Sequence, residues 1–110
     1  MTRIDLSNYR KSGIKVFSGA GLGSDLRDTL KLDVKDNEAE KITIVIPKDT
    51  WDLTPSFFQG LFTKSITKLG KDKFYEKYEF EADDSIINTI KDKYVPNILA
   101  KNNALTIGRK

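Results

Sequence analysis

One strand and one helix, close together in the chain, limit its possible folds more than any other feature. Residues 41–46 form a nearly continuous run of β-branched side chains, which predicts a strand buried on both faces in the middle of a sheet. Residues 54–69 predict a helix, because Thr54 is a good N-cap, Pro55 fits the first helical position and Gly70 fits the end. A buried strand that leads into such a helix is typical of an α/β fold.

The other expected elements follow from local patterns. Apolar residues line one face of the helix at helical spacing, namely Phe57, Phe58, Leu61, Phe62, Ile66 and Leu69. We expect further strands at residues 3–6, 14–17 and 78–81, a turn around 11–13 and a charged loop over 33–40. A second helix would carry Leu22, Leu26 and Leu30 on one face, and a last helix would begin at Asp83 or Asp84 and be interrupted by Pro96. A short strand or edge segment is expected from Ile98, Leu99, Leu105 and Ile107.

The absence of two residue types excludes several classes of chemistry. The chain of 110 residues contains neither cysteine nor histidine. The usual zinc ligands are therefore missing, as is the histidine base of Ser-His-Asp and Cys-His catalytic sites. We expect a protein that is not an enzyme and that holds no metal and no cofactor. The length fits one domain over residues 1–110, and no linker or repeat divides the sequence.

Charge and hydropathy indicate the location and the class of partner. No apolar run approaches the roughly 20 residues of a membrane span, and residues 1–10 do not resemble a signal peptide. We therefore expect a cytoplasmic protein that does not enter a membrane. The net charge is +3, and residues 25–40 are mainly acidic whereas 64–77 and 91–110 are mainly basic. Because no dense basic stripe is present, nucleic acid is not the expected partner.

A glycine cluster over residues 19–23 is the first candidate binding site. It follows an expected strand and precedes an expected helix, as a phosphate-binding loop does. A dinucleotide-binding fingerprint would need glycine at the last position of G-x-G-x-x-G, where Ser24 stands, and no Gly-Lys-Ser/Thr tripeptide completes a Walker loop. A flexible turn between strand and helix is the favoured interpretation, and a backbone anion site stays open.

The start of the helix at residue 54 is the second candidate. Ser56 stands two residues after the expected cap, so its hydroxyl is not needed for capping. A phosphate there would meet backbone N–H groups and the positive end of the helix, although Asp49 and Asp52 would oppose it. The simpler alternative is that Thr54 and Ser56 only begin a helix. Trp51, in the preceding loop, would either pack against the core or stand exposed as a binding anchor.

A pattern of residues spread from about Val16 to Tyr94 resembles a known family. It comprises residues 16–19, Gly23, 26–27, 54–62, 69–70, Phe74 and 77–80, and its most specific part is Pro-Ser-Phe-Phe-x-Gly-Leu-Phe from Pro55 to Phe62. The pattern is similar to that of the STAS-like domain family of small bacterial and phage-borne proteins. The resemblance implies a mixed β-sheet of about four to five strands with helices mainly on one face, as in anti-sigma-factor antagonists.

The resemblance also implies a function. In those antagonists an anti-sigma kinase phosphorylates a serine at the start of the helix after a central strand, and the unphosphorylated form binds the kinase. Ser56 falls near that place, with Thr54 as the alternative phosphoacceptor, although the antagonists' Asp-Ser-Ser-Gly motif is absent.

We therefore expect a non-catalytic regulatory module that binds a histidine-kinase-type ATPase or another regulator. The alternative is a nucleotide or anion sensor. The expected contact residues are Ser18, Gly19, Gly21, Gly23, Trp51 and Phe57.

Overall fold

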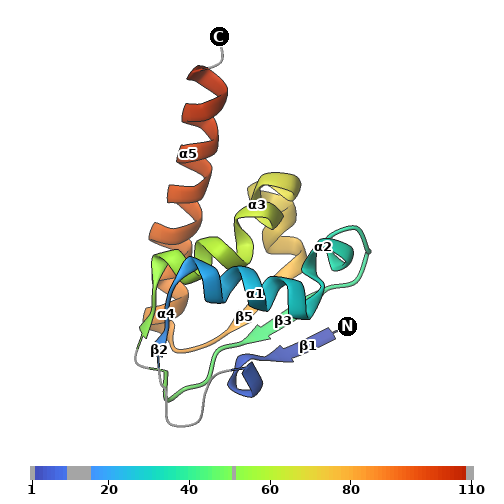
Figure 1. The fold of residues 1–110 in the computed structure, drawn as a ribbon, viewed down its shortest axis with the longest axis vertical. Coiled ribbons are helices and arrows are strands. Elements are labelled where there is room, and N and C mark those ends of the chain that lie inside the picture. The colour runs from blue at the N-terminus through green and yellow to red at the C-terminus, as the bar shows by residue number, and fades with distance from the viewer. Residues whose placement is uncertain (1, 10–15, 51, 109–110) are drawn as a thin grey trace.

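The protein is an α/β chain built around a small parallel sheet (Figure 1). The structure is a computed structural model that describes residues 2–9, 16–50 and 52–108. Strands β1 (Thr2–Asp5), β3 (Ile42–Val45) and β5 (Tyr78–Glu81) form a sheet in the order β1-β3-β5, and both pairings are parallel. Strands β2 (Val16–Phe17) and β4 (Asp52–Leu53) form a separate parallel pair.

This arrangement corrects the expected sheet. Instead of one mixed sheet of four to five strands, the described residues contain a three-stranded parallel sheet and a two-stranded pair. The chain turns after β3, where the Thr50 N–H donates to the Pro47 carbonyl at 3.0 Å. The turn carries β4 beyond the end of the sheet, where only two residues pair with β2.

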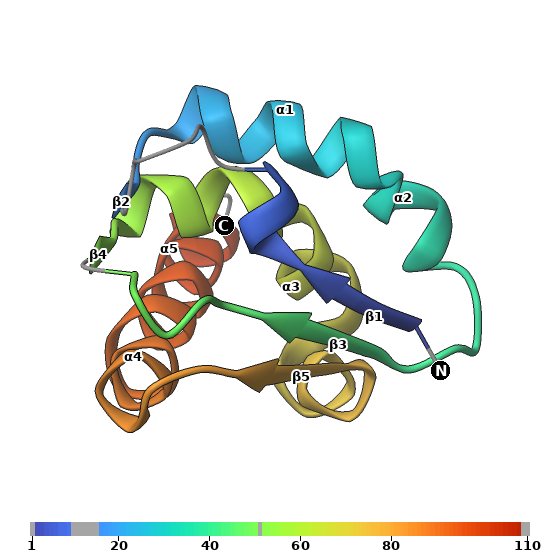
Figure 2. The ribbon, with the colours of Figure 1, turned by 90° about the horizontal axis from the view of Figure 1, so that it is seen from below.

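The longer helices lie on one side of the sheet. The helical elements are η1 (Leu6–Tyr9), α1 (Ala20–Leu30), α2 (Leu32–Lys35), α3 (Pro55–Lys77), α4 (Asp84–Thr89), the π-helical segment η2 (Ile90–Tyr94) and α5 (Val95–Gly108). In Figure 1, α1 and α3 lie above the three strands, and Figure 2 looks onto the strands from below. The opposite face of the sheet carries charged side chains, including Arg3, Glu79 and Glu81, which are exposed. No described helix is both long enough and apolar enough to cross a membrane.

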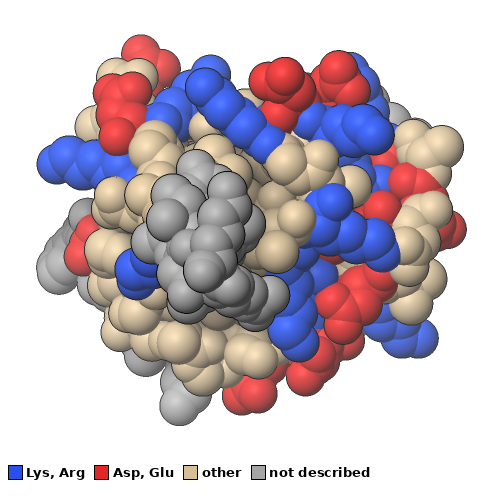
Figure 3. All heavy atoms as spheres, turned by 90° about the horizontal axis from the view of Figure 1, so that it is seen from above, with Lys and Arg blue, Asp and Glu red and all other residues tan. Residues whose placement is uncertain are grey.

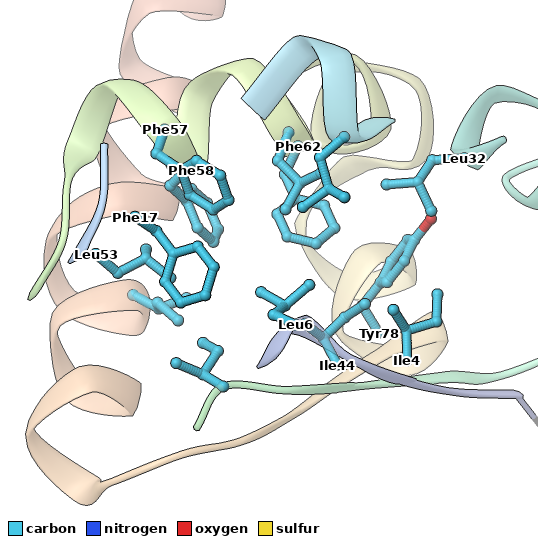
Figure 4. Close-up of a cluster of buried hydrophobic side chains, with 14 of the residues drawn as sticks. Ile4, Leu6, Phe17, Leu32, Ile44, Leu53, Phe57, Phe58, Phe62 and Tyr78 are labelled. Carbon is cyan, nitrogen blue, oxygen red and sulfur yellow. The ribbon is translucent and has the colours of Figure 1, made fainter. Parts of the chain in front are cut away.

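The core forms between the sheet and α3, as the sequence predicts. Ile42 and Ile44 of the central strand are 1% and 0% exposed. Figure 4 shows Ile4, Ile44 and Tyr78 rising from the strands toward the aromatic side chains of α3. The ring of Phe62 lies at the centre of this layer, with centroid distances of 5.1–5.6 Å to the rings of Phe58, Phe74, Tyr78 and Phe80. The predicted central strand is confirmed, including its burial.

The predicted element ends have mixed outcomes. The predicted end of a helix at Gly70 is confirmed, because Gly70 takes a non-helical φ of 79°, which only glycine adopts readily, and a second helical stretch continues beyond this kink to Lys77 within α3. Pro96 lies in the first turn of α5, where a missing N–H is tolerated, and the π-helical turn η2 precedes it. The residues expected as a strand after Pro96 are helical, and Ile98 is buried against the core. The expected loop over 33–40 begins within α2.

Candidate partner-binding surface at the start of α3

Thr54 joins the start of α3 to the end of β2. It is the N-cap, and its Oγ1 accepts hydrogen bonds from the N–H groups of Phe57 and Gly19, each at 3.3 Å. The Thr54 N–H donates to the Phe17 carbonyl at 2.8 Å. The first turn of α3 and the residues after β2 are therefore held as one unit, and the predicted cap is confirmed.

The exposed residues of this unit form one patch, which we call the α3-start surface. It consists of Ser18, Ala20, Gly21, Leu22, Pro55 and Ser56, all of which are exposed. Ser56 lies one helical turn before Gly60, and Gly60 packs directly on Ala20. The serine therefore stands beside the start of α1. Because Thr54 is half-buried and its hydroxyl already accepts two hydrogen bonds, Ser56 is the more accessible of the two candidate phosphoacceptors.

Two glycines allow α1 to cross α3 closely. A Cβ atom added to Gly23 would lie 2.2 Å from the Phe57 carbonyl oxygen, and one added to Gly60 would lie 2.3 Å from the Ala20 carbonyl oxygen. Gly23 is buried in this crossing, so it is a packing residue and the expectation that it contacts a partner is wrong.

The glycine cluster does not form a phosphate-binding loop. Helix α1 begins at Ala20, so Gly21 and Gly23 are helical. Gly19 takes a φ of 93°, which explains glycine at the turn from β2 into α1. Gly21 is exposed and has no atom within 4 Å of an added Cβ.

Of the two aromatic residues expected at the surface, one is in the core. Phe57 is 0% exposed, and its ring centroid lies 5.3 Å from that of Phe17, so its side chain is not available to a partner. Trp51 lies outside the described residues.

Leu22 is a surface residue that the sequence pattern missed. It is 44% exposed, whereas Leu26 and Leu30, which share its predicted face, are each 6% exposed. Helix α1 crosses α3 at Gly23, and Leu22 lies outside that contact. Helical spacing alone does not show this difference, which depends on the crossing of α1 and α3 at Gly23 and Gly60.

A buried polar network holds α1 in its orientation, and no pattern in the sequence indicates this network. Arg27 is 3% exposed, and each of its three nitrogens donates a hydrogen bond. The Nε and Nη2 groups reach Asp33 Oδ1 at 2.9 and 2.6 Å, and Nη2 also reaches Asp36 Oδ2 at 2.9 Å. Nη1 reaches the Leu61 carbonyl at 2.9 Å and Ser65 Oγ at 2.7 Å.

Asp36 is the centre of this network. Its carboxylate accepts from Ser65 Oγ at 2.6 Å and from the Tyr78 hydroxyl, as well as from Arg27. Burial and the hydrogen bond to Asp36 raise the pKa of Tyr78 well above its usual value. The network joins α1 and the residues after α2 to α3 and β5, so it holds these elements together.

A second tyrosine ties the start of α3 to the C-terminal helices. The Tyr94 hydroxyl donates to the carbonyl of Leu53, two residues before α3. Burial raises the pKa of Tyr94 above its usual value. The α3-start surface therefore rests on contacts from β2, α1 and η2.

The described residues contain no candidate metal site, and the face drawn in Figure 3 carries both signs of charge. Among them, no group of three or more aspartate or glutamate residues is placed to hold a metal ion. On the face shown in Figure 3, lysine and arginine side chains lie among aspartate and glutamate side chains.

No protein-family model matches the chain, and comparisons with curated proteins and with solved structures also give no match.

Proposed function

We propose that this protein is a non-catalytic regulatory module with a STAS-like arrangement, and that it binds a protein partner through the α3-start surface. One observation carries the proposal: Ser56 is exposed and has no capping role, on a helix start that Thr54 holds rigidly. The exposed Leu22 adds an apolar contact beside it. An apolar side chain within a polar surface of fixed shape suits a protein partner.

Phosphorylation of Ser56 would switch this binding. A histidine-kinase-type ATPase partner would transfer the γ-phosphoryl group of ATP to Ser56 Oγ, with release of ADP and of the hydroxyl proton. The added group carries a charge of about −1.5 to −2, and the positive end of α3 would stabilise it within the protein. The same charge would repel or fail to pair with a partner surface that fits the neutral serine.

The alternative of a nucleotide or anion sensor finds less support. The glycine cluster that would form its anion-binding loop instead forms the first turns of α1. Gly23 packs against α3 in the crossing of the two helices, as Gly60 does from the α3 side. The N–H of Phe57 is already bound to Thr54 Oγ1. Binding of a protein is therefore the better proposal.

Site-specific photo-crosslinking tests the surface. A photoreactive amino acid would be placed at Ser18 or Ser56, with Lys73 as a control position, exposed near the other end of α3. We expect the same partner to be captured from positions 18 and 56 and not from 73. Capture from all three positions alike, or from 73 alone, would remove the α3-start surface as the binding site.

A further inference from the structure

Strand β5 has an edge that no described strand covers, and a groove lies beside it. The sheet order is β1-β3-β5, so β5 pairs only with β3 within the described residues. In Figure 2, β5 is the outermost strand, with α4 at one end and the last turns of α3 at the other. A pocket of about 660 Å³ lies here, and the residues that line it include Lys71 and Tyr75 of α3, Phe80 of β5, Ile87 of α4 and Lys91 of η2. We call this pocket the β5 groove.

The hydrogen bonds of β5 show which backbone groups face its uncovered edge. The Ile46 N–H donates to the Glu81 carbonyl at 2.8 Å, so Glu81 bonds toward β3. Because residues alternate in a parallel ladder, Glu79 also bonds toward β3, and the N–H and C=O groups of Phe80 point to the uncovered edge. Such groups can pair with an added strand. Phe80 is therefore the residue at which an incoming strand would bind.

We propose that the β5 groove binds an extended segment of a partner protein in which an apolar residue stands between two basic residues. In an antiparallel arrangement the apolar residue lies opposite Phe80 and exchanges two backbone hydrogen bonds with it. In this mode of recognition the backbone supplies affinity and the side-chain pockets supply specificity. The groove adjoins the C-terminal half of α3, whereas Ser56 lies in the first turn, so the inference does not rest on the α3-start surface.

The helix side of the groove suits an apolar side chain. Residues that lie opposite each other in a sheet have their side chains on the same face, and the side chain of Phe80 packs against α3. The apolar residue of the segment would therefore enter the groove between Tyr75 and Ile87, which are both half-buried. An apolar side chain there extends the packing of residues that already lie against the core.

The charges that the helices contribute disfavour a basic side chain inside the groove. Lys71 and Lys91 line it, together with one acidic residue, Glu76. Neither lysine forms an ion pair with a described residue. Their ammonium groups would repel a lysine or arginine in the groove, while their methylene stems extend its apolar lining.

The opposite face of the sheet favours basic residues on both sides of the apolar one. Glu79 and Glu81 point away from the helices and are exposed. The two flanking residues of the segment would lie opposite them, where a lysine or arginine forms a cross-strand pair of opposite charges. Glu81 already binds Arg3 at 2.6 Å, and a carboxylate can accept a further donor. A second copy of β5 would instead place Glu79 opposite Glu81, so like charges oppose self-pairing.

A peptide titration followed by NMR spectroscopy tests the proposal. The probe is a synthetic peptide of about seven residues with isoleucine between two lysines, added to the full chain at up to about 5 mM. We expect the amide signal of Phe80 to shift as the peptide is added, because its N–H gains an acceptor. Three altered peptides should bind about fivefold or more weakly: one with glutamates for the lysines, one with lysine for the isoleucine, and one N-methylated at the isoleucine.

A matched pair of protein variants tests the charge pairing. Glu79→Lys should weaken binding of the lysine peptide about threefold or more. Asp25→Lys, the same change of charge at an exposed position of α1, should leave it unchanged. The dispersion of the NMR signals establishes that each variant is folded.

Three results would overturn the proposal. The first is a Phe80 amide signal that no peptide moves. The second is equal binding of the lysine peptide and any of its three altered forms, or equal binding of it by Glu79→Lys and the unchanged chain. The third is a shift of the Phe80 signal with protein concentration alone, which would indicate a second copy of the chain in the groove.

Discussion

Arg27 and Asp36 form an ion pair inside the protein, with 2.9 Å between Nη2 and Oδ2 and side-chain exposures of 4% and 0%. Buried charges are costly unless every hydrogen-bonding group has a partner. Here Ser65 and Tyr78 complete the coordination of the carboxylate. The pair holds α1 against α3, and thereby sets the position of the α3-start surface.

Removal of the arginine should destabilise the fold strongly. Arg27→Met leaves the Asp36 carboxylate buried without its cation, which costs about 3–5 kcal/mol in free energy of unfolding. Asp33→Asn is the matched control, because Asp33 binds the same guanidinium but its side chain is 63% exposed. It should cost about 1 kcal/mol or less. Urea denaturation measures the free energy of unfolding of both variants. Equal losses would show that the buried Asp36 carboxylate does not need the charge of Arg27.

The helix crossing predicts a contrast among alanine substitutions. Gly60→Ala forces a Cβ against the Ala20 backbone, so it should lower the free energy of unfolding by about 1–3 kcal/mol. Gly21→Ala, which meets open space within α1, should raise it by up to about 1 kcal/mol. Thermal unfolding of the two variants gives the comparison. A Gly60→Ala protein as stable as the unchanged chain would contradict the close approach of α1 and α3.

Tyr78 predicts how stability depends on alkaline pH. Burial, followed by the hydrogen bond to Asp36, raises the pKa of Tyr78 above its ordinary value of 10.0. Above that pH the unfolded chain has lost the tyrosine proton and the folded chain still holds it. Stability should therefore fall as pH rises beyond about 10, by about 1.4 kcal/mol per pH unit for this one proton.

Tyr78→Phe removes this contribution. The variant should be less stable at neutral pH by about 1–3 kcal/mol, because Asp36 loses a donor. Its stability should also decline less steeply than that of the unchanged chain above pH 10. Urea denaturation as a function of pH measures both slopes. Identical slopes would mean that Tyr78 ionises alike in the folded and unfolded chains.

The cap of α3 predicts different effects at two neighbouring hydroxyls. Thr54→Ala should cost about 1 kcal/mol, since Phe57 and Gly19 lose their acceptor, and Thr54→Ser should restore most of it. Ser56→Ala should change stability by less than about 0.5 kcal/mol, as for an exposed side chain without a structural role. Chemical denaturation measures the free energy of unfolding of both variants. A larger loss for Ser56→Ala than for Thr54→Ala would contradict the assignment of Thr54 as the cap.

The sequence predicted correctly those elements whose formation depends on residues close together in the chain. The β-branched run of β3 and the Thr54-Pro55 start of α3 depend on residues next to one another, and both were found where the sequence placed them. The pairing of two-residue strands was not predictable, because Phe17 and Leu53 meet only when distant segments come together.

In the candidate site, too, the features that depend on neighbouring residues were predictable, and those that depend on contacts between distant segments were not. Ser56 is exposed as the helix start implies, whereas the burial of Phe57 and Gly23 depends on how α1 crosses α3. Arg27 and Asp36 appear in the sequence as ordinary charged residues, since their burial requires Ser65 and Tyr78 from later elements.

The affinity of Ser56→Glu for the partner captured at position 56 tests the central claim most directly. Ser24→Glu is its control, because Ser24 is also an exposed serine but lies outside the α3-start surface. By isothermal titration calorimetry, Ser56→Glu should lose about 2 kcal/mol or more of binding free energy, or roughly thirtyfold in Kd. Ser56→Ala and Ser24→Glu should bind as the unchanged chain does. Equal affinities for Ser56→Glu and Ser56→Ala would contradict a phosphorylation switch at this surface.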